Sequence, residues 1–113
     1  RINALVVHDD AVFAALNRRV VVRWNGESWD DAGLDGEIVY DLLSVDGVLL
    51  AGTSSGGIWA LGGDGQWIAF GDRYTGGTIE SLAVTPEHLV VGSRHRGIWI
   101  RPREELPVDG TEE

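Results

Sequence analysis

The sequence predicts an all-β protein in which four-stranded antiparallel sheets repeat along the chain. Three observations predict it. Short apolar runs rich in Val, Ile and Trp alternate with turn-forming Asn-Gly and Asp-Gly pairs. No segment shows sustained helical periodicity. The same pattern returns in the segments 2–16, 39–53 and 79–93, which are offset from one another by 37 and 40 residues.

The first repeat contains four apolar or aromatic runs, which predict four strands. Polar breaks at residues 8–10 and 17–19 separate the first three runs. Asn25-Gly26 separates the last two and supplies the positive φ angles that a tight hairpin needs. The strands are expected at residues 2–7, 12–16, 20–24 and 28–32.

The second and third repeats follow the same order. Leu5, Leu42 and Leu82 are equivalent, and the tripeptide Gly-Ile-Trp at residues 57–59 returns at residues 97–99. The second repeat has a fourth strand, expected at residues 66–71. After residue 101 the third repeat has two nearby prolines and no Trp, so a fourth strand is not expected there.

A repeat of about 40 residues with four strands is typical of a β-propeller blade. One four-stranded sheet has two apolar faces, and stacking blade on blade covers both. Residues 82–84 and 89–91 are apolar at consecutive positions, as strands buried on both faces should be. We expect blades at 1–36, 37–78 and 79–102, the last with three strands, and a disordered acidic tail at 103–113.

A closed propeller needs about 4–8 blades, and this sequence holds fewer than three. The predicted fold is therefore a β-propeller segment with two complete four-stranded blades and a three-stranded third blade. We expect it to be part of a larger closed propeller. Two sources for the remaining blades stay open: missing N-terminal blades of the same chain, or other subunits that complete the ring.

Two phrases in the second and third repeats point to a family. VLLAGTSSGGIWALGGDGQW at 48–67 and LVVGSRHRGIWIRP at 89–102 resemble blades of bacterial and archaeal BNR/Asp-box-like propellers, within the wider WD-like group. The resemblance covers about residues 2–102 and implies an architecture rather than an activity. The Asp-box itself, S-x-D-x-G-x-T-W, is not satisfied, because residues 62–67 keep only its Asp, Gly and Trp.

Composition limits the partners. The net charge of −9 argues against general nucleic-acid affinity, and no apolar run is long enough to span a membrane. Cys is absent, and the spacing of His8, His88 and His95 fits no metal motif. We therefore expect neither a metal nor a cofactor, and interpret all three histidines as solvated residues of turns or strand starts.

The acidic surplus has two interpretations. The sequence has 18 Asp and Glu but no Lys, which resembles proteins of salt-loving archaea and predicts a halophilic protein. A genome that favours Arg codons would explain the missing Lys but not the charge. No signal peptide is recognisable in the sequence given, so we expect a cytoplasmic protein.

Charge is sorted by turn type. In a propeller, the turns between the second and third strands of each blade lie at the same edge as the turns between blades. Five of the nine Arg are expected at this edge. The opposite turns are acidic and contain no Arg. Arg offers bidentate contacts to carboxylate or phosphate, so we expect the first edge to bind a protein or an anionic ligand; solvated turn residues are the alternative. The candidate residues are Arg18, Arg19, Arg73, Tyr74, Arg94, His95 and Arg96.

The expected function is a non-catalytic recognition or scaffold module without catalytic residues. One alternative is the C-terminal part of a sialidase- or hydrolase-like propeller enzyme, with its catalytic residues in other blades. Another is a sugar-binding lectin. The hairpin WNGESW at 24–29 resembles the W-D-G-x-x-W hairpin of small fucose-binding propeller lectins, which implies a ligand contact for Trp24. Repeat equivalence of the other Trp residues predicts packing for them, and Trp24 is the Trp residue for which we most expect exposure.

Overall fold

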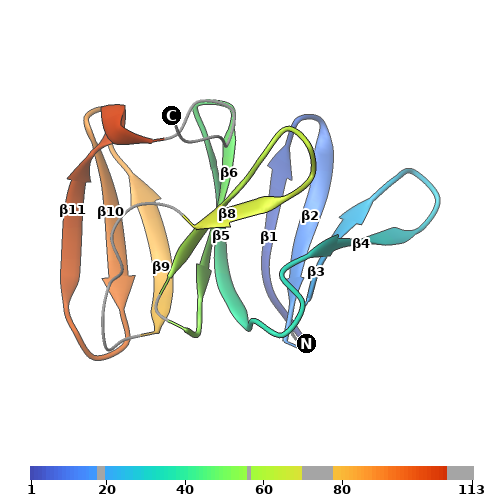
Figure 1. Ribbon diagram of the computed structural model, residues 1–113, viewed down its shortest axis with the longest axis horizontal. Helices are drawn as coiled ribbons and strands as arrows, with labels where there is room; N and C mark the ends of the chain where they lie inside the picture. The colour runs from blue at the N-terminus through green and yellow to red at the C-terminus, as the bar shows by residue number, and fades with distance from the viewer. Residues whose placement is uncertain (18–19, 56, 70–77, 107–113) are drawn as a thin grey trace.

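The computed structural model of the protein describes residues 1–17, 20–55, 57–69 and 78–106. Their strands form three antiparallel sheets of four, four and three strands, which stand side by side (Figure 1). We call these sheets blade 1, blade 2 and blade 3 in chain order. The predicted all-β fold is confirmed, and the sheets have the strand numbers expected of two complete blades and a three-stranded third.

Blade 1 is an up-and-down sheet in which each strand pairs with its neighbour in the chain. Two turn devices shape it. Asp9 and Asp10 have positive φ angles of 51° and 63°, which close the first hairpin, and the Asn25 side-chain oxygen accepts the backbone N–H groups of Glu27 and Ser28. Its strands are β1 (Ile2–His8), β2 (Ala11–Leu16), β3 (Val20–Trp24) and β4 (Trp29–Gly33).

Blade 2 repeats this order. Asp46 and Gly47 close its first hairpin with φ angles of 52° and 78°, as the Asp-Gly pair predicts. Of the strand expected at 66–71, residues 67–69 form β8, and residues 70 and 71 lie outside the described residues. The strands of blade 2 are β5 (Val39–Val45), β6 (Val48–Thr53), β7 (Ile58–Leu61) and β8 (Trp67–Ala69).

Blade 3 consists of β9 (Ile79–Val84), β10 (His88–Ser93) and β11 (Ile98–Pro102), and the short 3-10 helix η1 (Arg103–Glu105) follows it. As expected, residues 103–106, the described part of the chain after β11, do not extend the sheet. The prediction of a disordered tail from residue 103 is wrong for its first four residues. Leu106 is only 9% exposed and packs into the core, since η1 turns the chain back over blades 2 and 3. Residues 107–113 lie outside the described residues.

The core consists of two layers, one on each side of blade 2. All six residues of β6 are buried. Leu49 packs with residues of blade 1, whereas Leu50 packs with residues of blade 3. The space between blades is tight, because a Cβ atom added to Gly52 would lie 2.7 Å from the Cγ2 atom of Ile79 in blade 3. Burial on both faces is thus found for β6 of blade 2. The same expectation is wrong for residues 82–84 of blade 3, where Leu82 is buried but Ala83 is exposed, because no described blade covers the outer face of that sheet.

None of the described helices is long or apolar enough to cross a membrane.

Candidate functional site

The structure brings together only part of the predicted Arg-bearing edge. Arg94, His95 and Arg96 form the turn between β10 and β11, at the edge where β1 begins (Figure 1). Trp24 ends β3, so its hairpin lies at the opposite edge. The remaining candidates lie outside the described residues: Arg18, Arg19, Arg73 and Tyr74.

Arg94 is engaged within the protein. Its guanidinium donates to the Glu80 carboxylate from Nε at 2.8 Å, and its Nη2 lies 2.8 Å from the same oxygen. Its guanidinium carbon lies 5.2 Å from the centre of the Tyr40 ring in blade 2. The hydrogen bond to Glu80, followed by that to Tyr40, raises the pKa of Arg94. An anionic partner would therefore compete with Glu80 for this side chain.

His95 and Arg96 are exposed at the tip of the same turn. The Ser93 hydroxyl fixes the turn, because it accepts the Arg96 backbone N–H at 2.8 Å and donates to the Gly97 carbonyl at 3.0 Å. Gly97 has a φ angle of +85°, in the left-handed region that favours glycine. The turn therefore presents both side chains from a fixed backbone.

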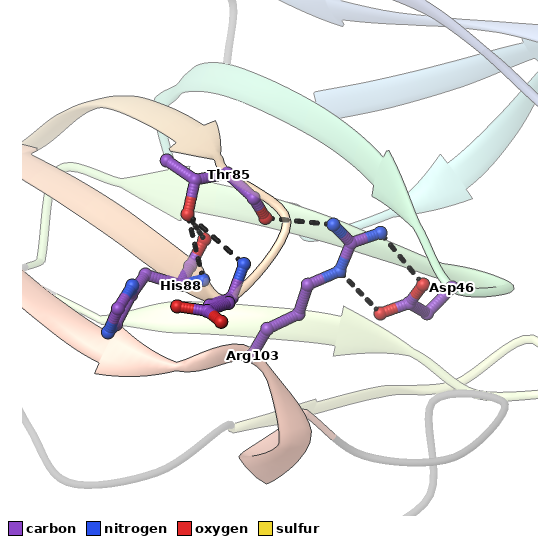
Figure 2. Close-up of polar contacts among 5 residues, drawn as sticks. Asp46, Thr85, His88 and Arg103 are labelled. Atoms are coloured by element: carbon purple, nitrogen blue, oxygen red, sulfur yellow. Dashed lines mark hydrogen bonds and ion pairs between the residues drawn. The ribbon is translucent and has the colours of Figure 1, made fainter.

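The opposite, acidic edge carries one Arg that does not belong to its turns. Arg103 of η1 donates to the Asp46 carboxylate from Nε at 2.8 Å and from Nη2 at 2.9 Å, and its Nη1 donates to the Thr85 carbonyl at 2.8 Å (Figure 2). The expectation that this edge lacks Arg is therefore wrong. Its turns contain no Arg, but Arg103 of η1 reaches the edge from the following segment. The hydrogen bond from Arg103 lowers the pKa of Asp46.

A groove of about 1010 Å³ opens between blades 1 and 2 at this edge. Sequence reasoning missed it, because its walls come from both blades and depend on how the blades stack. Polar groups of several kinds face it, which a site for a polar ligand requires. The polar and aromatic residues of its walls include Asp9, Arg23, Asp31, Trp59, Gln66 and Trp67.

His8 forms part of the groove wall. It is only 7% exposed, its Nδ1 lies 2.7 Å from the Ser44 hydroxyl oxygen in blade 2, and its ring packs edge-on against Phe13 at 5.9 Å. The interpretation of His8 as a solvated turn residue is therefore wrong. Blade 2 covers the end of β1, and a turn position in one sheet says nothing about a neighbouring sheet. His88 and His95 are exposed, as expected.

The two Trp residues of the groove differ in their hydrogen bonding. The Trp67 Nε1–H donates to the Ala32 carbonyl of blade 1 at 2.7 Å. The Trp59 Nε1–H is buried and has no partner, and it is the one side-chain N or O atom of this kind among the described residues. Buried polar groups normally have a partner, so this donor would gain a hydrogen bond from any bound molecule that reached it.

The exposed aromatic pair lies on the hairpin of blade 1. Trp24 and Trp29 pair across it with their ring centres 5.3 Å apart, and they are 37% and 48% exposed. Trp24 is exposed, as predicted, whereas the packing that repeat equivalence predicts for Trp29 is wrong, because Trp29 is exposed as well. Trp67 is the repeat equivalent of Trp29 and is less exposed, because blade 1 covers part of it. No described blade covers Trp29.

The described acids do not gather into a metal centre. No group of three or more His, Asp or Glu side chains in the described ranges is placed to hold an ion. Asp31 Oδ1 accepts the Gly33 backbone N–H at 2.8 Å, and Asp30 Oδ2 accepts from the Asn25 side chain at 3.0 Å. These carboxylates therefore shape the hairpin as well as line the groove.

Comparison with known proteins supports the fold alone. No family model and no curated protein matches the chain. Two computationally designed proteins are similar in structure, each with 19% sequence identity. Ika8 has a TM-score of 0.70 over 89% of this chain and 33% of its own, and Ika4 a TM-score of 0.71 over 90% of this chain and 66% of its own. The chain thus spans a third of one and about two thirds of the other.

Proposed function

We propose that this chain is a non-catalytic recognition module of a larger β-propeller, and that it binds its ligand in the groove between blades 1 and 2. The unpartnered Trp59 Nε1–H in the groove wall is the observation that carries the proposal. The Nε1 atom is closed off from solvent, so the groove wall must shift as the ligand enters. A ligand oxygen that then accepts this hydrogen would remove the cost of a buried donor without a partner.

The groove chemistry favours a saccharide as the ligand. A sugar hydroxyl both donates and accepts, so it can serve the Trp59 donor, the Asp9 and Asp31 carboxylates, and the Gln66 amide. The Arg23 guanidinium adds a further donor at the same groove. Aromatic walls suit the apolar face of a sugar ring. The resemblance of the 24–29 hairpin to those of fucose-binding lectins supports the same class of ligand.

Binding to a glycan array, followed by titration calorimetry with a sugar that binds, tests this function. Trp59→Phe keeps an aromatic ring but removes the donor, so we expect the affinity to fall about 3- to 10-fold, the worth of one hydrogen bond. No hydrogen bond within the protein is lost, so the melting temperature should fall only by the loss of ring packing, and by less than in Trp67→Phe. Trp99→Phe, at the same repeat position in blade 3, is the control and should bind as tightly as the unmodified chain. Unchanged affinity of Trp59→Phe, or an array without binding, would contradict the proposal.

A second binding surface is supported by the exposed turn of His95 and Arg96. We propose that this turn contacts an anionic or protein partner, as the Arg-rich turns predict. Arg96→Glu is the cleaner variant, because it leaves the Arg94–Glu80 pair in place. It should weaken partner capture in a pull-down, and Arg94→Glu with Arg96→Glu should weaken it further. Equal capture by all three chains would rule this surface out.

We also propose that the acidic surplus is an adaptation to high salt. Simple screening of surface charge is nearly complete at about 1 M salt, where the Debye length is about 3 Å. A haloadapted chain should continue to gain stability beyond that concentration. Melting temperatures measured in potassium chloride up to about 4 M, well beyond the concentration at which screening is nearly complete, test this directly. A melting temperature that is constant above 1 M would favour the codon-usage interpretation.

A further inference from the structure

The two outer faces of the blade array are apolar and exposed. Among the described residues, five large aliphatic side chains are exposed, and all of them lie on β1 or β11. Contiguous apolar surface of this kind marks an interaction site. The residues are Ile2, Leu5 and Val7 on β1, with exposures of 53%, 65% and 65%, and Ile98 and Ile100 on β11, with 71% and 64%.

The exposed leucine of β1 occupies a position that is buried in the other two blades. Leu42 is 5% exposed and packs in the layer between blades 1 and 2, and Leu82 is 7% exposed and packs in the layer between blades 2 and 3. In both cases the side chain packs on the preceding blade. Leu5 is the equivalent residue of blade 1, where no described blade precedes it.

A second position shows the same contrast. Val39 and Ile79 are fully buried against the preceding blade, whereas Ile2 is 53% exposed. The free face of blade 1 therefore presents the surface with which blades 2 and 3 dock. We call this surface, formed by Ile2, Leu5 and Val7, the rear face.

The exposed side chains of β11 belong to the opposite surface. Val21 and Ile58 occupy the position equivalent to Ile98, with exposures of 0% and 1%, and each packs against the following blade. Strand pairing fixes the equivalence, since Ile58 lies opposite Gly52 and Ile98 opposite Gly92. Ile98 and Ile100 therefore form a front face on blade 3, and no described blade covers it.

We propose that a second copy of this chain docks its rear face onto the front face of blade 3, head to tail. The chain makes this junction twice within itself, so each copy carries both complementary halves. Ile79 packs beside Gly52 inside the chain. Ile2 of the second copy would take the equivalent place beside Gly92, from which the Ser81 hydroxyl must turn aside. Such an interface uses different surfaces on the two partners and can close into a ring.

The interface is tested by the mass of the purified 113-residue chain in sedimentation and light-scattering experiments over a range of concentrations. Leu5→Glu disables the rear face, and Ile98→Glu disables the front face. Both side chains are exposed, so the core of each variant stays intact, and circular dichroism checks this. The unmodified chain should give dimers or larger assemblies of its 12.2 kDa subunit, and each variant alone should be monomeric.

Mixing the two variants distinguishes a head-to-tail junction from other contacts. One intact rear face and one intact front face remain in the mixture, so it should form a dimer with one copy of each variant and nothing larger. Glu87→Arg, a charge change in an exposed turn of blade 3, is the control and should assemble like the unmodified chain. An unmodified chain that stays monomeric, or variants that fail to pair when mixed, would overturn the proposal. Dimers of Ile98→Glu alone would indicate rear-to-rear contact and overturn it as well.

Discussion

Arg103 holds the carboxylate of Asp46 with two hydrogen bonds, although 57 residues separate them in the chain. The same guanidinium donates to the Thr85 carbonyl, so one side chain joins η1 to the first hairpin of blade 2 and the first hairpin of blade 3. Bidentate pairing of this kind gives a more defined geometry than a single contact. Arg103 thereby fixes η1 over the junction in which Leu106 is buried.

Arg103→Ala should lower the melting temperature at neutral pH, and the loss should depend on pH. The hydrogen bond from Arg103 lowers the pKa of Asp46 in the folded state. The stabilisation is therefore fully present above the ordinary Asp pKa of about 3.9 and disappears as the pH falls below it. In thermal melts from pH 7 to pH 2.5, the difference in melting temperature between the unmodified chain and Arg103→Ala should shrink below about pH 4. The part that remains in acid is the contribution of the bond to the Thr85 carbonyl, which does not titrate. Asp46→Asn tolerates the left-handed turn and keeps the bond from Arg103 to the Thr85 carbonyl, so at pH 7 its melting temperature should lie between those of the unmodified chain and Arg103→Ala. A difference between the unmodified chain and Arg103→Ala that widens in acid would contradict this account.

Gly52→Ala should destabilise the contact between blades 2 and 3. The new Cβ atom would lie 2.7 Å from the Ile79 Cγ2 atom and 3.2 Å from the Ile79 carbonyl oxygen, so one blade must shift. Overpacking of this kind costs about 1–3 kcal/mol. Gly63→Ala is the matched control, because nothing lies within 4 Å of its added Cβ atom. Urea unfolding that gives equal stability for the two variants would show that the blades are less closely packed than described.

Trp67→Phe should lower stability by about 1–3 kcal/mol, because the Ala32 carbonyl would lose its donor and part of the ring contact would be lost. Trp29→Phe is the control at the equivalent position, where the side chain is 48% exposed. In the monomeric state that control should change stability by less than about 0.5 kcal/mol. Denaturant unfolding of both variants at low protein concentration measures the difference, and comparable losses would show that the two positions are not distinct in burial.

His8→Ala should also destabilise the junction between blades 1 and 2. It removes the contact with the Ser44 hydroxyl at 2.7 Å and the ring packing on Phe13. Loss of one hydrogen bond and a small buried ring costs about 1–3 kcal/mol. His88→Ala replaces an exposed residue and should stay within about 0.5 kcal/mol of the unmodified chain. Both free energies of unfolding come from the same denaturant assay. If His8→Ala left the free energy of unfolding unchanged, His8 would not stabilise the junction between blades 1 and 2.

The strand pattern could be predicted from local residues, since hairpins close where the chain itself supplies the geometry. Asp46-Gly47 has the positive φ angles that the pair implies, and the Leu42 and Leu82 positions are buried in both later repeats. The 3-10 helix at Arg103–Glu105 was harder to predict, because Arg103 of this helix pairs with the distant Asp46 carboxylate.

The groove could not be predicted from the sequence. Trp59 and Trp99 have the same repeat position, which correctly suggests packing for both, yet only Trp59 leaves a buried donor unpartnered at the groove. The difference arises from the blades around them rather than from the residues beside them in the chain. Arg94 is a similar case, because its Glu80 and Tyr40 partners come from two different strands.

Every strand pair in the described sheets joins neighbours in the chain, and this order has a consequence for how the protein opens. Each blade can lose its structure without unthreading another, so partial unfolding should proceed in blade-sized units. Blade 2 has both faces covered, whereas blades 1 and 3 each have one. In the monomeric state, amide hydrogens of β6 should therefore exchange last in deuterated water, and those of β1 and β11 should exchange early through fraying from the two ends.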